Sequence, residues 1–143
     1  MTQSDIKKIV ENLIQTFLDA GKISIDLRKK GLTKEIKSDN TPVSNGDLEV
    51  NKILSKKILS LTPNIPIVSE ETSENKSKNN LENFWLIDPI DGTYDYINDL
   101  DEFTINAGLI IQKKPVAGLI YAPAKNRMFY SYGDNFSFEL ING

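Results

Sequence analysis

The stretch of sequence that decides the fold is FWLIDPIDGT, residues 84–93. Its first four residues are bulky and apolar, which predicts a buried β-strand that ends at Asp88. Pro89 fixes its own φ and favours an extended Asp88, so the first carboxylate leaves the strand in a defined direction. Gly92 lets backbone approach a ligand closely, and a helical turn opening at Thr93 would present free N–H groups to an anion. The stretch therefore predicts a site for a hard divalent cation that holds a phosphate.

The same residues also fit a simpler structure. Asp, Pro and Gly are common turn formers, so the segment from Asp88 to Thr93 can be a surface turn without a ligand. A second source of carboxylates bears on this choice, because Glu70 and Glu71 end another short predicted strand, residues 67–71. Carboxylates that meet at neighbouring strand ends repel each other unless a cation lies among them. Either these side chains point apart, or a metal is present.

Composition excludes several kinds of chemistry. The chain has 143 residues and 39% apolar content, enough for one compact domain with a core. It contains no cysteine, so disulfide scaffolds, thiolate metal sites and cysteine nucleophiles are excluded. It also contains no histidine, which removes histidine zinc sites, phosphohistidine intermediates and imidazole bases. Carboxylates, hydroxyls, lysines and metal-bound water remain as candidates.

The charge pattern gives no reason to expect a nucleic-acid partner. Net charge is −3 and the lysines are dispersed, without a basic stripe. A small anionic substrate would need a metal to bind such a protein. Residues 1–8 lack the apolar core of a signal peptide, and no apolar run approaches bilayer length. We therefore expect a cytoplasmic protein without a transmembrane segment.

The predicted helices come before most of the predicted strands. Apolar residues recur at helical spacing from Ile6 to Leu27, which predicts a long helix from a cap at Ser4 to a stop at Gly31. A second helix carries apolar residues between positions 48 and 59. A short helix or turn is expected at residues 94–101, and strands at 103–111, 116–121, 127–132 and 136–140. Short connections imply antiparallel pairing. The fold class is therefore α+β, with two N-terminal helices packed on one face of a mainly antiparallel sheet.

Asp47 lies in the first turn of the second predicted helix, which Ser44 or Asn45 can cap. An acidic side chain interacts favourably with the macrodipole at this position, and that alone would account for Asp47. A chemical role for Asp47 follows only from its relation to other motifs.

Three motifs in a fixed order resemble the inositol monophosphatase family of lithium-sensitive, magnesium-dependent phosphomonoesterases. Two further segments are most similar to its 3'(2'),5'-bisphosphate nucleotidase, or CysQ-type, branch. The resemblance covers nearly the whole chain, and Ser44 stands where threonine is more usual. The motifs are DNTPVSNGD (39–47), SEE (69–71) and WLIDPIDGT (85–93), and the further segments are EFTIN (102–106) and GLIYAP (118–123), with Met128-Phe129 after it.

The resemblance implies a site for two or three Mg²⁺ ions. Glu70, Asp88 and Asp91 would be carboxylate ligands, and the backbone carbonyl of Ile90 would supply a further oxygen. Carboxylate and carbonyl oxygens suit this hard cation. Glu70 is preferred over Glu71 as the direct ligand.

The resemblance also implies the catalytic roles. The substrate phosphate would lie against Asp91 and the N–H groups of Gly92 and Thr93. A metal-bound water would be the nucleophile, held from the metal side by Glu70. Thr93, hydrogen-bonded to Asp47, would orient that water and help to take its proton, in an in-line displacement without a phosphoenzyme.

The implied activity is removal of the 3'-phosphate from adenosine 3',5'-bisphosphate to give AMP, and of the same phosphate from 3'-phosphoadenylyl sulfate in sulfur metabolism. An inositol or sugar monophosphatase is the alternative within the family. A third hypothesis is a metal-binding module without turnover, because residues 1–143 correspond to the N-terminal metal- and phosphate-binding domain, and the family's C-terminal domain has no counterpart here. The resemblance is compatible with pairing into a homodimer and with peripheral association at the inner membrane.

Overall fold

The computed structural model describes residues 1–69, 81–133 and 137–141. The two long helices precede most of the strands, as the sequence predicts, and the short helix expected within residues 94–101 begins one residue earlier, as α3. The elements are α1 (Gln3–Lys30), β1 (Lys34–Ile36), β2 (Pro42–Ser44), α2 (Asn45–Leu61), β3 (Ile67–Ser69), β4 (Phe84–Asp91), α3 (Thr93–Ile97), β5 (Thr104–Ile111), β6 (Lys114–Ala122), the 3₁₀ turn η1 (Pro123–Lys125), β7 (Arg127–Tyr132) and β8 (Ser137–Ile141).

The first helix is capped by Thr2 and not by Ser4, so the predicted cap is wrong. The Thr2 hydroxyl accepts a hydrogen bond from the Asp5 N–H (3.1 Å), and the Asp5 carboxylate accepts one from the Thr2 N–H (2.9 Å). This reciprocal box needs an acidic or amide side chain three residues after the cap. Ser4 has Lys7 at that position, which cannot accept a hydrogen bond. The predicted stop at Gly31 is confirmed by its positive φ of 98°.

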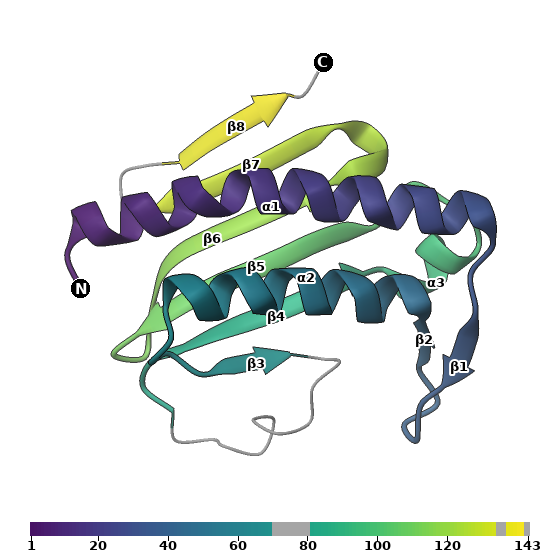
Figure 1. Cartoon of the computed structure of the whole chain (residues 1–143), viewed down its shortest axis with the longest axis horizontal. Helices are drawn as coiled ribbons and strands as arrows, with labels where there is room; N and C mark the ends of the chain where they lie inside the picture. The colour runs from purple at the N-terminus through teal and green to yellow at the C-terminus, as the bar shows by residue number, and fades with distance from the viewer. Residues whose placement is uncertain (70–80, 134–136, 142–143) are drawn as a thin grey trace.

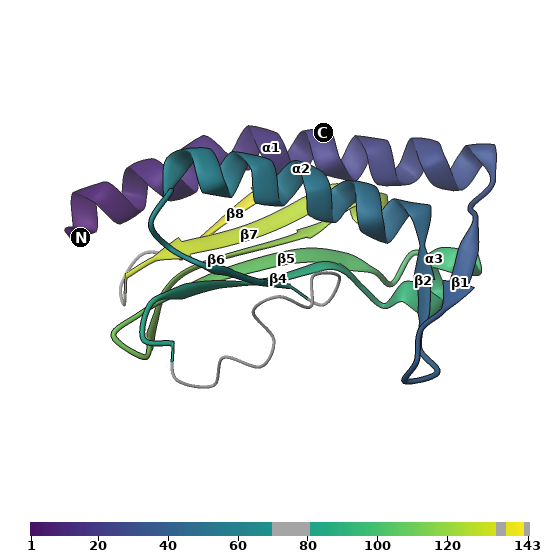
Figure 2. The same cartoon turned by 60° about the horizontal axis from the view of Figure 1, so that its bottom comes forward.

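Both long helices lie on the same side of a six-stranded sheet (Figure 1). The strand order is β3-β4-β5-β6-β7-β8, and β1 pairs with β2 in a separate hairpin. β4 to β8 pair antiparallel in sequence order, whereas β3 is parallel to β4. Figure 2 shows α1 and α2 lying side by side over the sheet. The predicted α+β fold with a mainly antiparallel sheet is therefore confirmed.

The core lies between the helices and the facing side of the sheet. Trp85 is fully buried there, and its indole N–H donates to the Thr62 hydroxyl (3.0 Å). Thr62 in turn donates to the Ile58 carbonyl (2.9 Å) at the end of α2. A buried indole N–H needs such an acceptor. This chain of contacts fastens α2 to β4, the strand that carries the DPIDGT motif.

The opposite side of the sheet carries exposed apolar side chains. Leu86 and Ile120 each lie between buried neighbours, Phe129 follows the buried Met128, and the three are 40% to 52% exposed. None of the helices among the described residues combines the length and the apolar character that crossing a membrane requires.

Gly21→Ala tests the contact between α1 and β6. Alanine is preferred over glycine in a helix by about 1 kcal/mol. A Cβ at Gly21, however, would collide with the Tyr121 ring and lie 3.2 Å from the Pro123 Cβ. Overpacking costs about 1–3 kcal/mol, so we expect a net loss of about 1 kcal/mol in the free energy of unfolding, measured by urea denaturation.

Gly108→Ala is the control, because the nearest heavy atom to a Cβ there is 3.9 Å away. Its effect should stay within about 0.5 kcal/mol. A Gly21→Ala protein at least as stable as wild type would contradict the packing described here.

Candidate functional site

β4 does not end at Asp88, so that prediction is wrong. Asp88 pairs with Asn106 and Asp91 pairs with Thr104, leaving Pro89 and Ile90 opposite one residue of β5. This is a β-bulge, and a proline, which has no N–H to donate to the ladder, is tolerated there. The strand continues through the bulge to Asp91, which excludes the alternative of a plain surface turn from Asp88.

The bulge places both carboxylates on one face of the sheet. In a regular strand, residues three positions apart point to opposite faces. Asn106 and Thr104 are two positions apart and share a face, so their partners Asp88 and Asp91 share it too. Asp88 is half-buried and Asp91 is exposed. The DPID spacing therefore delivers two acidic groups to the same side of the sheet.

Gly92 turns the chain from β4 into α3. Its φ of 91° and ψ of 44° lie in the left-handed region, and a Cβ there would lie 2.7 Å from the Glu102 carbonyl oxygen. Thr93 is the first residue of α3, so a helical turn does open at this position. The first N–H groups of a helix have no acceptor within it, so this turn presents donors beside Asp91.

Asp47 is completely buried and each of its carboxylate oxygens accepts hydrogen bonds. Oδ2 accepts from the N–H of Ser44 (2.9 Å) and from its hydroxyl (2.5 Å), completing a capping box at the start of α2. Oδ1 accepts from the Thr93 hydroxyl (2.8 Å). Helix capping accounts for Oδ2, but the bond from α3 to Oδ1 is additional. The predicted Thr93–Asp47 hydrogen bond is therefore present.

The Thr93 hydroxyl also lies 3.1 Å from the Ile90 carbonyl oxygen. A hydroxyl has one proton, and the closer, charged Asp47 is the stronger acceptor. The Ile90 carbonyl consequently keeps capacity to accept from or coordinate another group.

Two of the predicted site residues that the structure describes are in contact with Thr93, whose hydroxyl donates to Asp47 and lies near the Ile90 carbonyl. Asp88 and Asp91 belong to the strand that carries Ile90, and Gly92 follows it in the turn before Thr93. Glu70 and Glu71 lie outside the described residues, so their predicted roles stay predictions. Within residues 1–69, 81–133 and 137–141, no three acidic side chains form a group that could hold a metal.

The donor atoms fit a hard cation. The carboxylates of Asp88 and Asp91 and the carbonyl of Ile90 are all oxygen donors, which Mg²⁺ and Ca²⁺ prefer. A pocket of about 290 Å³ opens beside Asp91 and Gly92. A larger one, about 800 Å³, lies along α1 and contains none of the predicted site residues.

Tyr96 is part of the site's support, and sequence reasoning missed it. Its hydroxyl donates to the Ser24 carbonyl of α1 (2.7 Å), and its ring fills the space where a Cβ on Gly46 would lie. Gly46 immediately precedes Asp47, so the ring packs beside the cap of α2. Burial, together with the nearby charge of Asp47, raises the pKa of Tyr96. The only sequence signal was an aromatic residue three positions after Thr93, which is one helical turn.

A scan against protein families matches residues 5–138 to the Inositol monophosphatase family. The chain belongs to this family. The resemblance expected from the three motifs is thereby confirmed.

A similar relative agrees with this membership, and solved structures share the fold. The 3'(2'),5'-bisphosphate nucleotidase CysQ of Haemophilus influenzae is 37% identical over 122 residues, which cover 84% of this chain and 45% of that relative. SuhB of Bartonella henselae superposes with a TM-score of 0.82 at 23% identity, covering 92% of this chain and 52% of that chain. An IMPase/NADP phosphatase complexed with Mg²⁺ and phosphate superposes with a TM-score of 0.78 at 18% identity, covering 97% of this chain and 52% of that chain. The chain thus spans about half the length of the relatives it matches.

Thr93→Val tests the hydrogen bond to Asp47. The change keeps the shape of the side chain but leaves Oδ1 of Asp47 buried without its donor from Thr93. A buried polar group that loses its partner costs about 1–3 kcal/mol, and we expect that loss in urea denaturation. Thr41→Val is the matched control, because the Thr41 hydroxyl donates to the exposed Asp39 (2.5 Å), where water can replace it. Equal effects of the two changes would contradict the assignment.

Tyr96 also predicts how stability depends on pH. Because its pKa is raised on folding, neutral Tyr96 contributes stability that is fully present below about pH 10 and is lost as pH rises above it. The decline should approach about 1.4 kcal/mol per pH unit. Urea denaturation of wild type and Tyr96→Phe between pH 8 and 11 checks this, and the variant should show the shallower decline. Parallel profiles would contradict the prediction.

Proposed function

We propose that this chain forms the metal- and phosphate-binding part of a Mg²⁺-dependent phosphomonoesterase. Its substrate would be adenosine 3',5'-bisphosphate, or 3'-phosphoadenylyl sulfate, from which water removes the 3'-phosphate. The observation that carries the proposal is the bulge and turn from Asp88 to Thr93. It gathers two carboxylates, a carbonyl and a hydroxyl anchored on a buried acid at one end of β4.

The residues at this end of β4 would fall into two groups, metal ligands and phosphate-binding residues. Asp88, Asp91 and the Ile90 carbonyl would hold Mg²⁺, together with Glu70. Gly92 and Thr93 would bind a phosphate oxygen through their N–H groups. Bound Mg²⁺ supplies a Lewis acid that lowers the pKa of a water molecule and offsets the charge of the phosphate.

Thr93 and Asp47 would handle the proton. Because the Thr93 proton is directed at Asp47, the lone pairs of its oxygen can accept a hydrogen bond from the attacking water. As that water bonds to phosphorus, the bond from phosphorus to the ribose 3'-oxygen breaks, and the water proton passes to Thr93 while the Thr93 proton passes to Asp47. The departing 3'-oxygen takes a proton from solvent water, and Asp47 then returns its proton to solvent, so charge and proton count balance. Glu70 would hold the water from the other side. These 143 residues contain no histidine or cysteine, so neither a phosphohistidine nor a phosphocysteine intermediate can form on them.

Support for the nucleotide substrate comes from the Haemophilus influenzae relative, whose name states a 3'(2'),5'-bisphosphate nucleotidase activity. An inositol or sugar monophosphate is the alternative, since the solved structures of similar fold include a staphylococcal inositol monophosphatase. The same structure is described as an inhibitory complex with LiCl, which supports lithium inhibition as a further property of this chain. A chain that spans half of its relatives is also compatible with metal binding without turnover.

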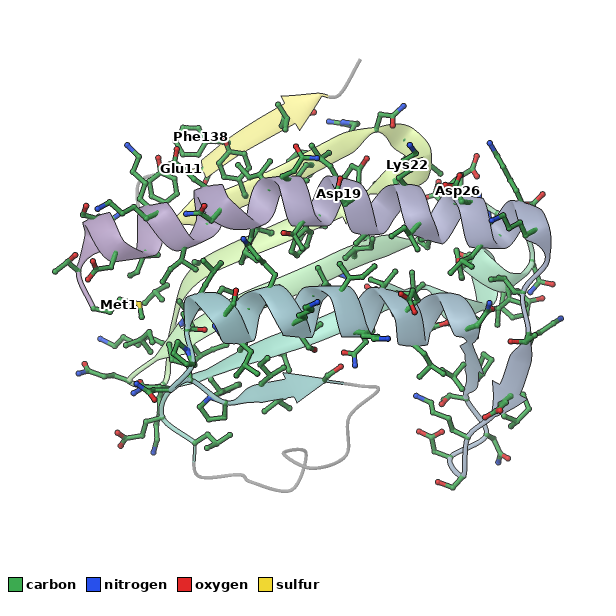
Figure 3. The ribbon with its side chains drawn as sticks, viewed as in Figure 1. Met1, Glu11, Asp19, Lys22, Asp26 and Phe138 are labelled. Carbon is green, nitrogen blue, oxygen red and sulfur yellow. The ribbon has the colours of Figure 1, made fainter. Side chains whose placement is uncertain are left out.

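Asp88→Asn and Asp91→Asn test the metal site. Each change removes a charged oxygen, so we expect calorimetric Mg²⁺ affinity to fall about tenfold or more, equivalent to about 1.4 kcal/mol. Asp19→Asn is the control for charge, because Asp19 projects from α1 on the side away from α2 (Figure 3). Its Mg²⁺ affinity should match that of wild type. Equal losses in all three variants would contradict a local site.

Phosphate release from adenosine 3',5'-bisphosphate and from inositol 1-phosphate tests the substrate. The proposal expects Mg²⁺-dependent release that favours the nucleotide, is inhibited by lithium and is abolished by Asp91→Asn. Release by Asp91→Asn after metal removal would overturn the mechanism. Metal binding without release by this chain, with release by a longer homologous chain, would favour the binding module.

A further inference from the structure

Arg28, in the last turn of α1, is bound on several sides. Its guanidinium donates to the Leu100 carbonyl (2.6 Å) and to Asp101 (3.2 Å), and it lies 3.3 Å from a carboxylate oxygen of Asp99. The side chain is only 10% exposed. Asp99 is 87% exposed, so that ion pair contributes little. The hydrogen bond to Leu100 instead holds a backbone atom, the Leu100 carbonyl oxygen, in place.

The guanidinium also lies against two aromatic rings. Its central carbon is 5.7 Å from the centroid of Tyr96 and 5.0 Å from that of Phe103, and the two ring centroids are 4.8 Å apart. A cation over an aromatic face is attracted by the ring, and more strongly as water is excluded. Arginine is suited to this position because its planar group stacks and donates at once.

These contacts reach the functional site from two directions. Residues 99–103 follow α3, and the Glu102 carbonyl is the backbone atom packed against Gly92. Tyr96 packs against Gly46, the neighbour of Asp47. Arg28 therefore touches both the segment behind the Gly92 turn and the ring beside the cap of α2.

We infer that Arg28 is a positioning residue for the Thr93–Asp47 pair and for the turn at Gly92. It touches neither substrate nor metal, and acts by holding Tyr96, Phe103 and the Leu100 carbonyl in place. The inference rests on the proposed function only in treating the Thr93–Asp47 pair as part of a catalytic site. A purely structural role would stabilise the whole domain without a particular effect on α3.

Hydrogen exchange in Arg28→Met distinguishes these roles. The N–H of Tyr96 donates to the carbonyl of the cap residue Gly92, and those of Asn98 and Leu100 donate to carbonyls within α3, so exchange at these three amides reports the opening of α3. We expect exchange at these three amides to accelerate about tenfold, and to do so more than at core amides of α1 and α2. Equal acceleration at all amides, or none, would overturn the inference.

Arg127→Met is a matched control. Arg127 also pairs with an acid, Glu139 (2.8 Å), and lies over a ring, Phe129 (5.1 Å). It belongs to β7, so its loss should leave exchange in α3 unchanged. If Arg28→Met does not fold, Arg28→Lys serves instead, because lysine keeps the charge but cannot stack and donate as a planar fork.

A double-mutant cycle ties Arg28 to the site. If Arg28 positions Thr93, then Thr93→Val should raise the unfolding equilibrium constant by a smaller factor in the Arg28→Met background than in wild type. Equal factors in both backgrounds would overturn the inference.

Titration of inorganic phosphate in the presence of Mg²⁺ should show affinity reduced about tenfold in Arg28→Met. Wild type that binds no phosphate would refute the proposed function, while exchange and the cycle would still decide the role of Arg28.

Discussion

A buried carboxylate has to be surrounded by hydrogen-bond donors, and this requirement at Asp47 fixes how the parts of the site meet. Ser44 supplies two donors from the residue that caps α2, and Thr93 supplies a third from the start of α3. Thr93 is 46 residues away in the sequence, so the two helix starts are joined by an interaction that no local preference could create. The Thr93 oxygen thereby takes its position from the cap of α2.

The bulge in β4 solves a different geometric problem. A strand presents alternate residues to alternate faces, so Asp88 and Asp91 would be separated by the sheet if β4 were regular. One extra residue in the strand restores them to a common face, and the absence of a proline N–H makes Pro89 compatible with that extra position. The two aspartates therefore share a face only because of the bulge, and Pro89 is tolerated between them for the same reason.

Local signals in the sequence predicted the α+β fold, the antiparallel strands, a cap for α2 at Ser44 or Asn45, and a short helix or turn at residues 94–101. In the structure Ser44 is the cap, and α3 begins one residue earlier than expected, at Thr93. The strand end at Asp88 was wrong because proline is equally compatible with a strand end and a bulge, and only the partner strand decides between them. Arg28 has the appearance of an ordinary basic residue in a last helical turn. Its hydrogen-bond partners lie 72 and 73 positions further along, and no periodicity reports such contacts. Glu70 stays a prediction, because the described residues do not include it.

A helix as short as α3, five residues, does not hold its own shape, because helix nucleation in isolation is unfavourable. Its geometry has to come from tertiary contacts at its start and its end. Thr93 fixes the start through Asp47, whereas Tyr96 and the Arg28 contacts fix the end through α1. Under the proposed function, the DPIDGT motif supplies the groups that would act on a phosphate, and residues outside the motif determine how firmly those groups are held. A substitution of Tyr96 or Arg28 would therefore leave the motif intact and still loosen the site.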